Sequence, residues 1–194
     1  SRSLSDYDTL VEEMVFINGV KMVAPIIEGQ SLISQNGSAS GVLVRGMKPQ
    51  DFKRREILAT SAVQGRLANY ENGEIAIGKV LADKLMLNIG DTITLTAPKV
   101  RSTPFGTVPI QRGFTVGMIF DVGMYEYNSG FVFMPIETAQ KFYRMPENSA
   151  SYLELEAQDI HDLNWVKQNI TKSVEQPLTL YDWRDANSSF VNAL

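Results

Sequence analysis

Residues 92–120 have the sequence TITLTAPKVRSTPFGTVPIQRGFTVGMIF, and this stretch decides the fold class. Apolar residues alternate with threonines over 92–97, and apolar residues alternate again over 114–120. Strict alternation is typical of half-buried strands. The stretch therefore predicts two strands joined by a connection, residues 98–112, that is longer than the usual hairpin turn of about two to five residues.

The connection has the features of a rigid arm. Pro98, Pro104 and Pro109 restrict the backbone, and Thr103-Pro104-Phe105-Gly106 has the proline and glycine spacing of a β-turn. Apolar and basic side chains share the segment, namely Phe105, Val108, Ile110, Lys99, Arg101 and Arg112. A preorganised arm of this kind suits docking to a protein partner. Spacing alone equally allows a loop that folds back onto its own core and buries Phe105.

The rest of the chain predicts an α+β protein. Helices are expected at 6–16, 49–55, 79–87, 135–142 and 160–170, and strands at 20–27, 40–47, 74–77, 131–134, 151–156 and 178–181. The order of elements in 1–35 recurs in 149–182, so the two chain ends are expected to form one α+β lobe. Residues 36–148, including the hairpin 98–112, form an inserted β-rich lobe. Residues 149–182 begin with a strand that has no counterpart in residues 1–35, which predicts that the chain begins inside a domain.

Composition narrows the classes of function. At 194 residues, with 44% hydrophobic and 21% charged residues, the chain can bury a core. The net charge of −4, with no basic run beyond Lys53-Arg54-Arg55, argues against a nucleic-acid partner. The chain has no cysteine, which removes thiolate metal sites and disulfides. No apolar run approaches the roughly 18 residues of a membrane span, and neither a metal nor a cofactor is predicted.

One segment comes close to a phosphate-binding loop. Gly73-Glu-Ile-Ala-Ile-Gly78-Lys79-Val80 fits G-x-x-x-x-G-K, but valine stands where that motif has its magnesium-binding Ser or Thr. Residues 75–77 alternate like a strand, whereas a phosphate cradle needs a loop with free amides. His161, the only histidine, is expected in an exposed or capping role near a helix start. No catalytic residue is predicted, and the chain is not expected to be an enzyme.

Several segments together resemble a known family: Val23-Ala-Pro-Ile-Ile-Glu-Gly-Gln30, Ser40-Gly-Val-Leu-Val-Arg-Gly46, Glu74-Ile-Ala-Ile-Gly78 with Ile89-Gly90-Asp91, and Thr103 to Arg112. They are similar to the periplasmic domains of LolC/LolE-type permeases, which are relatives of MacB and FtsX. The resemblance covers nearly the whole chain. It implies a MacB-like α+β fold, with a Porter-like lobe from 1–35 and 149–182, a Sabre-like lobe from 36–148, and a lead-in to the second membrane span at 183–194.

The most specific part of the resemblance is the hairpin. In LolC-type subunits this segment is the Hook, which captures the soluble lipoprotein carrier LolA. The resemblance therefore implies that Pro104, Phe105 and Gly106 form the tip of the arm and that Gln111 with Arg112 forms a polar pad at its base. The full set of expected partner-binding residues is Arg101, Thr103, Pro104, Phe105, Gly106, Val108, Pro109, Gln111 and Arg112. Thr94 and Thr96 stand where LolC-type chains can carry a basic residue, so the charge of the pad departs from the family pattern.

The resemblance implies a location and further partners. The intact permease would lie in the inner membrane with this domain facing the periplasm. It would work with a LolD-type ATPase, a second permease subunit that is LolE-like or identical, and lipoprotein cargo. The alternatives are a MacB-like efflux domain that binds an adaptor and an FtsX-like regulator of cell-wall hydrolases. Neither needs the Thr-Pro-Phe-Gly tip, so the hairpin discriminates between them and the LolC-type hypothesis.

Overall fold

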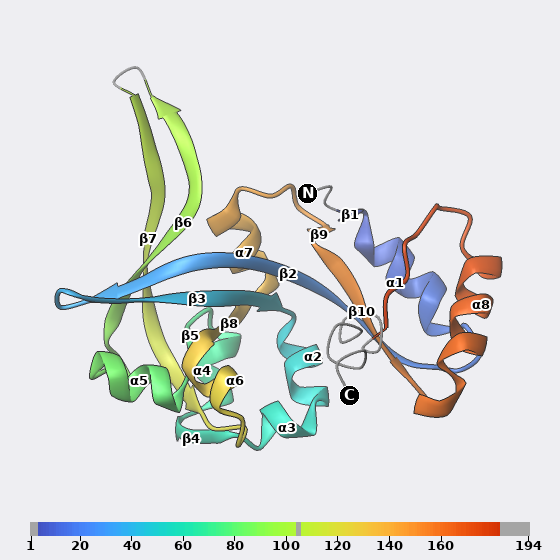
Figure 1. Ribbon diagram of the computed structural model, residues 1–194, viewed down its shortest axis with the longest axis horizontal. Coiled ribbons are helices and arrows are strands. Elements are labelled where there is room, and N and C mark those ends of the chain that lie inside the picture. The colour runs from blue at the N-terminus through green and yellow to red at the C-terminus, as the bar shows by residue number, and fades with distance from the viewer. Residues whose placement is uncertain (1–3, 104–105, 183–194) are drawn as a thin grey trace, which may run out of the picture. The chain divides into compact units, whose positions relative to one another are not determined.

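The computed structural model describes residues 4–103 and 106–182, with the backbone alone for 99–103 and 106–107 (Figure 1). The described residues form two compact units: one comprises Leu4–Ser5 and Ala24–Tyr152, the other Asp6–Val23 and 153–182. The chain passes from one unit to the other at Ala24 and after Tyr152, whereas the sequence predicts boundaries after residues 35 and 148. The fold class is α+β, as predicted.

The first unit is built on strands that pair in a closed ring. Each strand pairs with the next and the last returns to the first, in the order β2 (Val20–Gln35), β3 (Ser38–Met47), β8 (Phe131–Pro135), β5 (Ile75–Gly78), β7 (Gly106–Phe120), β6 (Thr92–Thr103) and β2 again. A short antiparallel pairing closes the ring, with Leu32, Ile33 and Ser34 opposite Thr96, Leu95 and Thr94. Closure leaves no unpaired edge where β2 and β6 meet.

Short strands and helices complete this unit. β4 (Ala62–Gly65) pairs with β7, and β1 (Leu4–Ser5) pairs with β9 (Ser149–Ala150). The helices are α2 (Pro49–Arg54), α3 (Glu56–Ala59), α4 (Leu67–Glu71), α5 (Lys79–Leu85), α6 (Tyr125–Gly130) and α7 (Ile136–Tyr143). The expected helices at 49–55, 79–87 and 135–142 correspond to α2, α5 and α7. Six elements were not predicted from the sequence, and all are six residues or shorter: α3, α4, α6, β1, β4 and β9.

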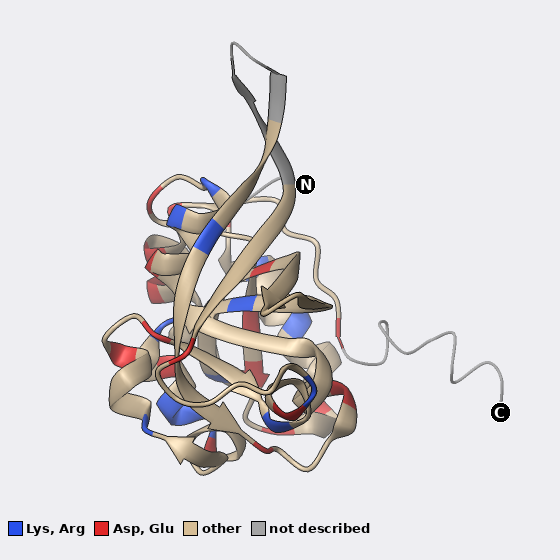
Figure 2. Cartoon of the chain, turned by 90° about the vertical axis from the view of Figure 1, so that its left-hand side faces the viewer, with Lys and Arg blue, Asp and Glu red and all other residues tan. Residues whose placement is uncertain are grey.

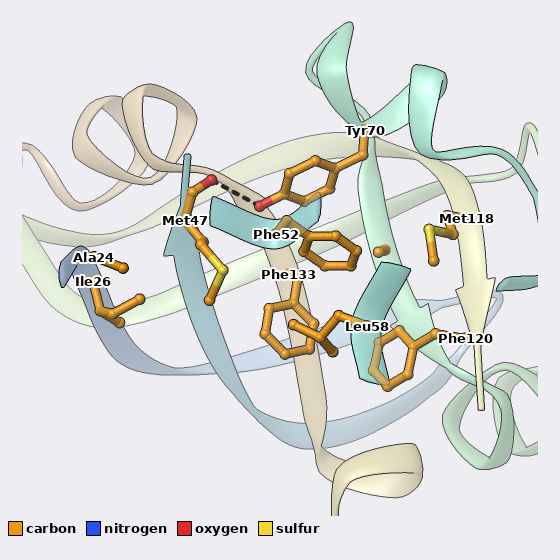
Figure 3. Packing of buried hydrophobic residues seen from close by; sticks show 10 residues of the cluster. Ala24, Ile26, Met47, Phe52, Leu58, Tyr70, Met118, Phe120 and Phe133 are labelled. Atoms are coloured by element: carbon orange, nitrogen blue, oxygen red, sulfur yellow. Dashed lines mark hydrogen bonds between the residues drawn. The ribbon is translucent and has the colours of Figure 1, made fainter. Parts of the chain in front are cut away.

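Aromatic residues dominate the core of this unit (Figure 3). The ring of Phe133 packs edge-on against Phe52 and Phe120, with centroids 5.6 and 5.4 Å apart. Tyr70 is fully buried beside Phe52, and its hydroxyl lies 2.9 Å from the carbonyl oxygen of Met47 and 2.7 Å from that of Met134. The hydroxyl donates at the ends of β3 and β8, and burial raises its pKa well above the ordinary value. These contacts join α2, α4 and the closed ring of strands into one core.

Glycines in the segments that carry the family resemblance lie where elements approach closely. A Cβ at Gly29 would stand 2.6 Å from Tyr143 Cζ, and one at Gly46 would overlap Ala139 Cβ. Both contacts are with α7, so these glycines let that helix pack against β2 and β3. A Cβ at Gly78 would overlap the backbone of Asn128 in α6 in the same way. These three glycines are explained by internal packing.

The second unit has its own apolar cluster. α1 (Tyr7–Val15) and α8 (Leu163–Ser173) pack Leu10, Met14, Val166 and Ile170 together, and β10 (Tyr152–Ala157) contributes Leu153 and Leu155. The strand expected at 178–181 is wrong, because 174–182 contains neither helix nor strand. Its alternating pattern reflects half-buried Leu178 and Leu180 packed against the cluster. Ile160 does not belong to the apolar face of α8, since it lies in the 3-10 helix η1 (Ile160–Asp162) and is exposed.

Glycine substitutions on β3 test this account of the packing. We expect Gly46→Ala to lower the free energy of unfolding by about 1–3 kcal/mol, because its methyl group overlaps α7. Gly41→Ala on the same strand is the matched control. A Cβ there meets nothing within 4 Å, and we expect a change below about 1 kcal/mol. Urea titration of both variants measures the difference, and equal midpoints would contradict the packing argument.

Candidate protein-docking hairpin

The outer halves of β6 and β7 form a paired ribbon that extends beyond the closed ring (Figure 1). Pairing runs from Thr92↔Thr115 in the ring to Thr103↔Gly106 at the far end. The sequence predicts strands only at 92–97 and 114–120, so both strands are longer than expected. The described backbone of this segment is a hairpin and not a loop folded back onto the core.

A bulge accommodates the first proline of the ribbon. The register shifts between Ala97, which pairs with Ile110, and Val100, which pairs with Pro109. Pro98 therefore lies in the bulge, where its missing N–H removes no hydrogen bond from the ladder. A bulge also increases the twist of a strand pair, and Figure 2 shows the ribbon twisting as it leaves the unit. The local sequence thus sets both the root and the twist of the hairpin.

The predicted partner-binding residues fall on this ribbon to different extents. Pro104 and Phe105 lie outside the described residues. For Arg101, Thr103 and Gly106 only the backbone is described, and it belongs to the two strands. The partner-binding role of the tip therefore stays a prediction. The structure describes side chains only at the base of the hairpin.

At the base of the hairpin the described side chains are accessible. Val108 is half-buried, whereas Pro109, Gln111 and Arg112 are exposed. No described side chain from Pro98 to Gly113 belongs to the buried core, which resumes at Phe114. The base thus presents Pro109, Gln111 and Arg112 on the surface of the chain.

Gln111 and Arg112 point to opposite faces, because neighbouring residues of a strand alternate. Gln111 is opposite Thr96, which is opposite exposed Leu32, so Gln111 lies on the outer face. Arg112 shares the other face with Phe114, and its guanidinium carbon lies 5.5 Å from the centroid of that ring. The cation–π contact holds the guanidinium over the ring. The expected single polar pad is therefore divided between two faces of the ribbon.

The hairpin is basic within an acidic chain. Residues 92–120 contain Lys99, Arg101 and Arg112 and no Asp or Glu, while the whole chain has a net charge of −4. Figure 2 shows acidic positions on the body of the chain and none on the described part of the ribbon. Such asymmetry favours encounter with an acidic partner surface, and its effect falls as salt screens the charges.

The other segments considered from the sequence have structural roles. Ile75 to Gly78 form the fully buried strand β5, which confirms that the near-match to a phosphate-binding loop is a strand. His161 is exposed, as expected, and the capping residue is Asp159, whose carboxylate accepts a 2.8 Å hydrogen bond from the His161 backbone N–H at the start of η1. Across 4–103 and 106–182, no helix is both long and apolar enough to cross a membrane.

The described residues thus form an α+β protein in which a basic paired ribbon extends beyond a closed ring of strands. Comparison with known sequences identifies the protein family. The profile of the MacB-like periplasmic core domain family matches residues 1–173, and the chain belongs to this family.

Similar proteins of known sequence confirm the resemblance to LolC-type permeases. The chain is 29% identical over 176 residues to the lipoprotein-releasing system transmembrane protein LolC of Xylella fastidiosa, covering 88% of this chain and 41% of that protein. It is 26% identical over 179 residues to LolC of Neisseria meningitidis, covering 91% of this chain and 43% of that protein. The chain thus spans about two-fifths of the length of these relatives.

Solved structures support the fold. The extracellular domain of the noncanonic ABC-type transporter YknZ from Gram-positive bacteria superposes with a TM-score of 0.59 at 12% identity, covering 88% of this chain and 81% of that chain. The periplasmic region of MacB from Actinobacillus actinomycetemcomitans gives a TM-score of 0.57 at 12% identity, covering 88% and 73%. At this identity the likeness concerns the fold alone.

Shortening the hairpin separates its role from that of the core. We expect a variant in which Asn-Gly joins Ala97 directly to Ile110 to keep the ring, because those two residues already pair and Asn-Gly favours a tight turn. Its free energy of unfolding should stay within about 1 kcal/mol of wild type, as measured by urea titration. A non-cooperative or strongly destabilised transition would show that the ribbon is part of the folding unit.

Proposed function

We propose that this chain is the periplasm-facing domain of a lipoprotein-releasing ABC transporter permease and that its hairpin recruits a LolA-type chaperone. The observation that carries the proposal is the ribbon of β6 and β7, whose base presents exposed Pro109, Gln111 and Arg112 and no side chain of the buried core. The similarity to LolC over most of the chain supports the same class of transporter.

The geometry of the base suggests how a partner would engage it. Because Gln111 and Arg112 lie on opposite faces, a partner that contacts both must enclose the ribbon rather than rest on one side. A paired ribbon loses little conformational freedom on binding, so preorganisation favours its insertion into a concave partner. The basic charge of Lys99, Arg101 and Arg112 would select a partner that is acidic around its opening.

The remaining assignments follow from the same proposal. The unit with Asp6–Val23 and 153–182 would be the Porter-like lobe and the ring the Sabre-like lobe. The full permease would lie in the inner membrane with a LolD-type ATPase and a second, LolE-like or identical, permease subunit. This domain would break no bonds. It would hold the chaperone while acylated cargo passes to it. The MacB-like efflux alternative is supported by the family match and by likeness of fold, but no feature of the ribbon favours it.

A binding titration with a purified LolA-type chaperone tests the proposal. We expect wild type to associate and Pro104→Ala, Phe105→Ala and Arg112→Ala each to lower the affinity about tenfold or more, as truncated anchor residues do. The loss from Arg112→Ala should shrink as salt rises, since it removes a charge.

Matched controls lie outside the hairpin. Phe16 is 86% exposed and Arg66 is exposed, so Phe16→Ala and Arg66→Ala remove the same residue types from other surfaces. Both should bind like wild type. If wild type fails to associate, or if all three hairpin variants bind as tightly as wild type, the recruitment role is refuted.

A further inference from the structure

Two glycines of the first unit lack the structural reasons that explain Gly29, Gly46 and Gly78. A Cβ built at Gly41 in β3, or at Gly130 at the end of α6, meets nothing within 4 Å. Neither residue has a positive φ, so neither backbone conformation requires glycine. Glycine inside a strand weakens it, and where nothing internal demands it the residue often marks a place where another molecule approaches closely.

Both glycines line the same groove. Its volume of about 640 Å³ falls in the range of roughly 300–1,000 Å³ typical of binding sites. The lining comes from β2, β3, β6 and the end of α6, and consists of Gln30, Ser31, Leu32, Gly41, Val42, Leu43, Thr96, Ala97, Pro98 and Gly130. No charged residue is among them, and the surface combines apolar side chains with a few uncharged polar groups. A side chain at either glycine would occupy space that the groove keeps open.

The groove is continuous with the base of the hairpin. Thr96, Ala97 and Pro98 belong both to the groove and to the root of β6. One row of paired residues crosses four strands, from Gln111 to Thr96, then to Leu32 and Gly41. Gln111 and Gly41 are exposed and Leu32 is 45% exposed, so the row faces outward. A partner that contacts Gln111 on this face therefore also lies close to the groove.

We propose that the groove is a second part of the docking surface and receives an uncharged, largely apolar segment of the chaperone that binds the hairpin. This inference rests on the proposed function. The basic ribbon would attract the chaperone at long range, and the groove would bury apolar surface once the two proteins meet. Leu32 is the central contact, and Gly41 and Gly130 allow the backbone of the partner to come close.

The lining favours a protein segment over other occupants. Gln30 and Thr96 place polar groups along the groove, which a peptide can satisfy by hydrogen bonds and an acyl chain cannot. The Ser31 hydroxyl is buried and lies 2.8 Å from that of Tyr143. The groove shares Thr96, Ala97 and Pro98 with the root of the hairpin. This favours the partner of the hairpin as the occupant over a second copy of this chain. An acyl chain and a second copy are the occupants that the experiment must separate from a chaperone segment.

Groove-filling substitutions test the inference. Gly41→Trp should lower the affinity for a LolA-type chaperone about tenfold or more, and Leu32→Ala should lower it several-fold. These losses should persist at high salt, unlike that of Arg112→Ala, because apolar burial is not screened. The matched control is Ala62→Trp, which adds the same side chain at an exposed position of β4 outside the groove. Urea titration verifies folding, and Leu32→Ala decides the question if Gly41→Trp is unstable.

Each outcome has a defined meaning. Salt-independent losses for Gly41→Trp and Leu32→Ala, with wild-type binding by Ala62→Trp, support the groove. If both groove variants bind like wild type while Phe105→Ala and Arg112→Ala bind weakly, the inference is overturned and the hairpin role stands. If wild type does not bind, both fail. If Gly41→Trp instead abolishes only binding of a fluorescent palmitate, or only self-association in sedimentation velocity, the occupant is a lipid or a second copy and the proposal is wrong.

Discussion

The short pairing between β2 and β6 is the constraint on which the rest of the first unit depends. Leu32, Ile33 and Ser34 meet Thr96, Leu95 and Thr94, and these contacts turn an open sheet into a ring. Ile33 and Leu95 point inward and are fully buried, whereas Leu32 and Thr96 point outward. The same few residues therefore close the core and form the root of the hairpin. A projecting ribbon needs such a fixed root, because a mobile base would lose the benefit of preorganisation.

Outward and inward faces of the ring serve different purposes. On the outer face, aromatic packing around Phe133 and the buried hydroxyl of Tyr70 join the strands to α2 and α4, since the register places Phe133 beside Arg45 on the side opposite Gly46. On the inner face, Gly46 permits close approach of α7. Farther along the outer face, exposed Leu32 and Gly41 continue the row that begins at Gln111. The division explains why glycines on one strand, Gly46 and Gly41, are assigned opposite roles.

Local pattern predicted much of this fold and little of its closure. Alternation located β5, β8 and the ring portions of β6 and β7, and apolar spacing located α1, α5 and α7. The distance between the two alternating stretches predicted a long connection, yet a bulge at Pro98 lets strand pairing continue through it. The pairing of Leu32 with Thr96 joins strands distant in sequence over three residue pairs, too short to leave a pattern. The groove depends on that register and could not be predicted from the sequence. The separation of Gln111 from Arg112 follows from strand pairing through a segment that the sequence predicts as a connection.

Hydrogen–deuterium exchange of the domain with and without a LolA-type chaperone tests the central claim most directly, because it maps the contact without any substitution. The account predicts slower exchange in residues 94–112 and in residues 30–43 when the chaperone is added, with little change in Asp6–Val23 and 153–182. Protection confined to the second unit, with unchanged exchange in the ribbon, would contradict it.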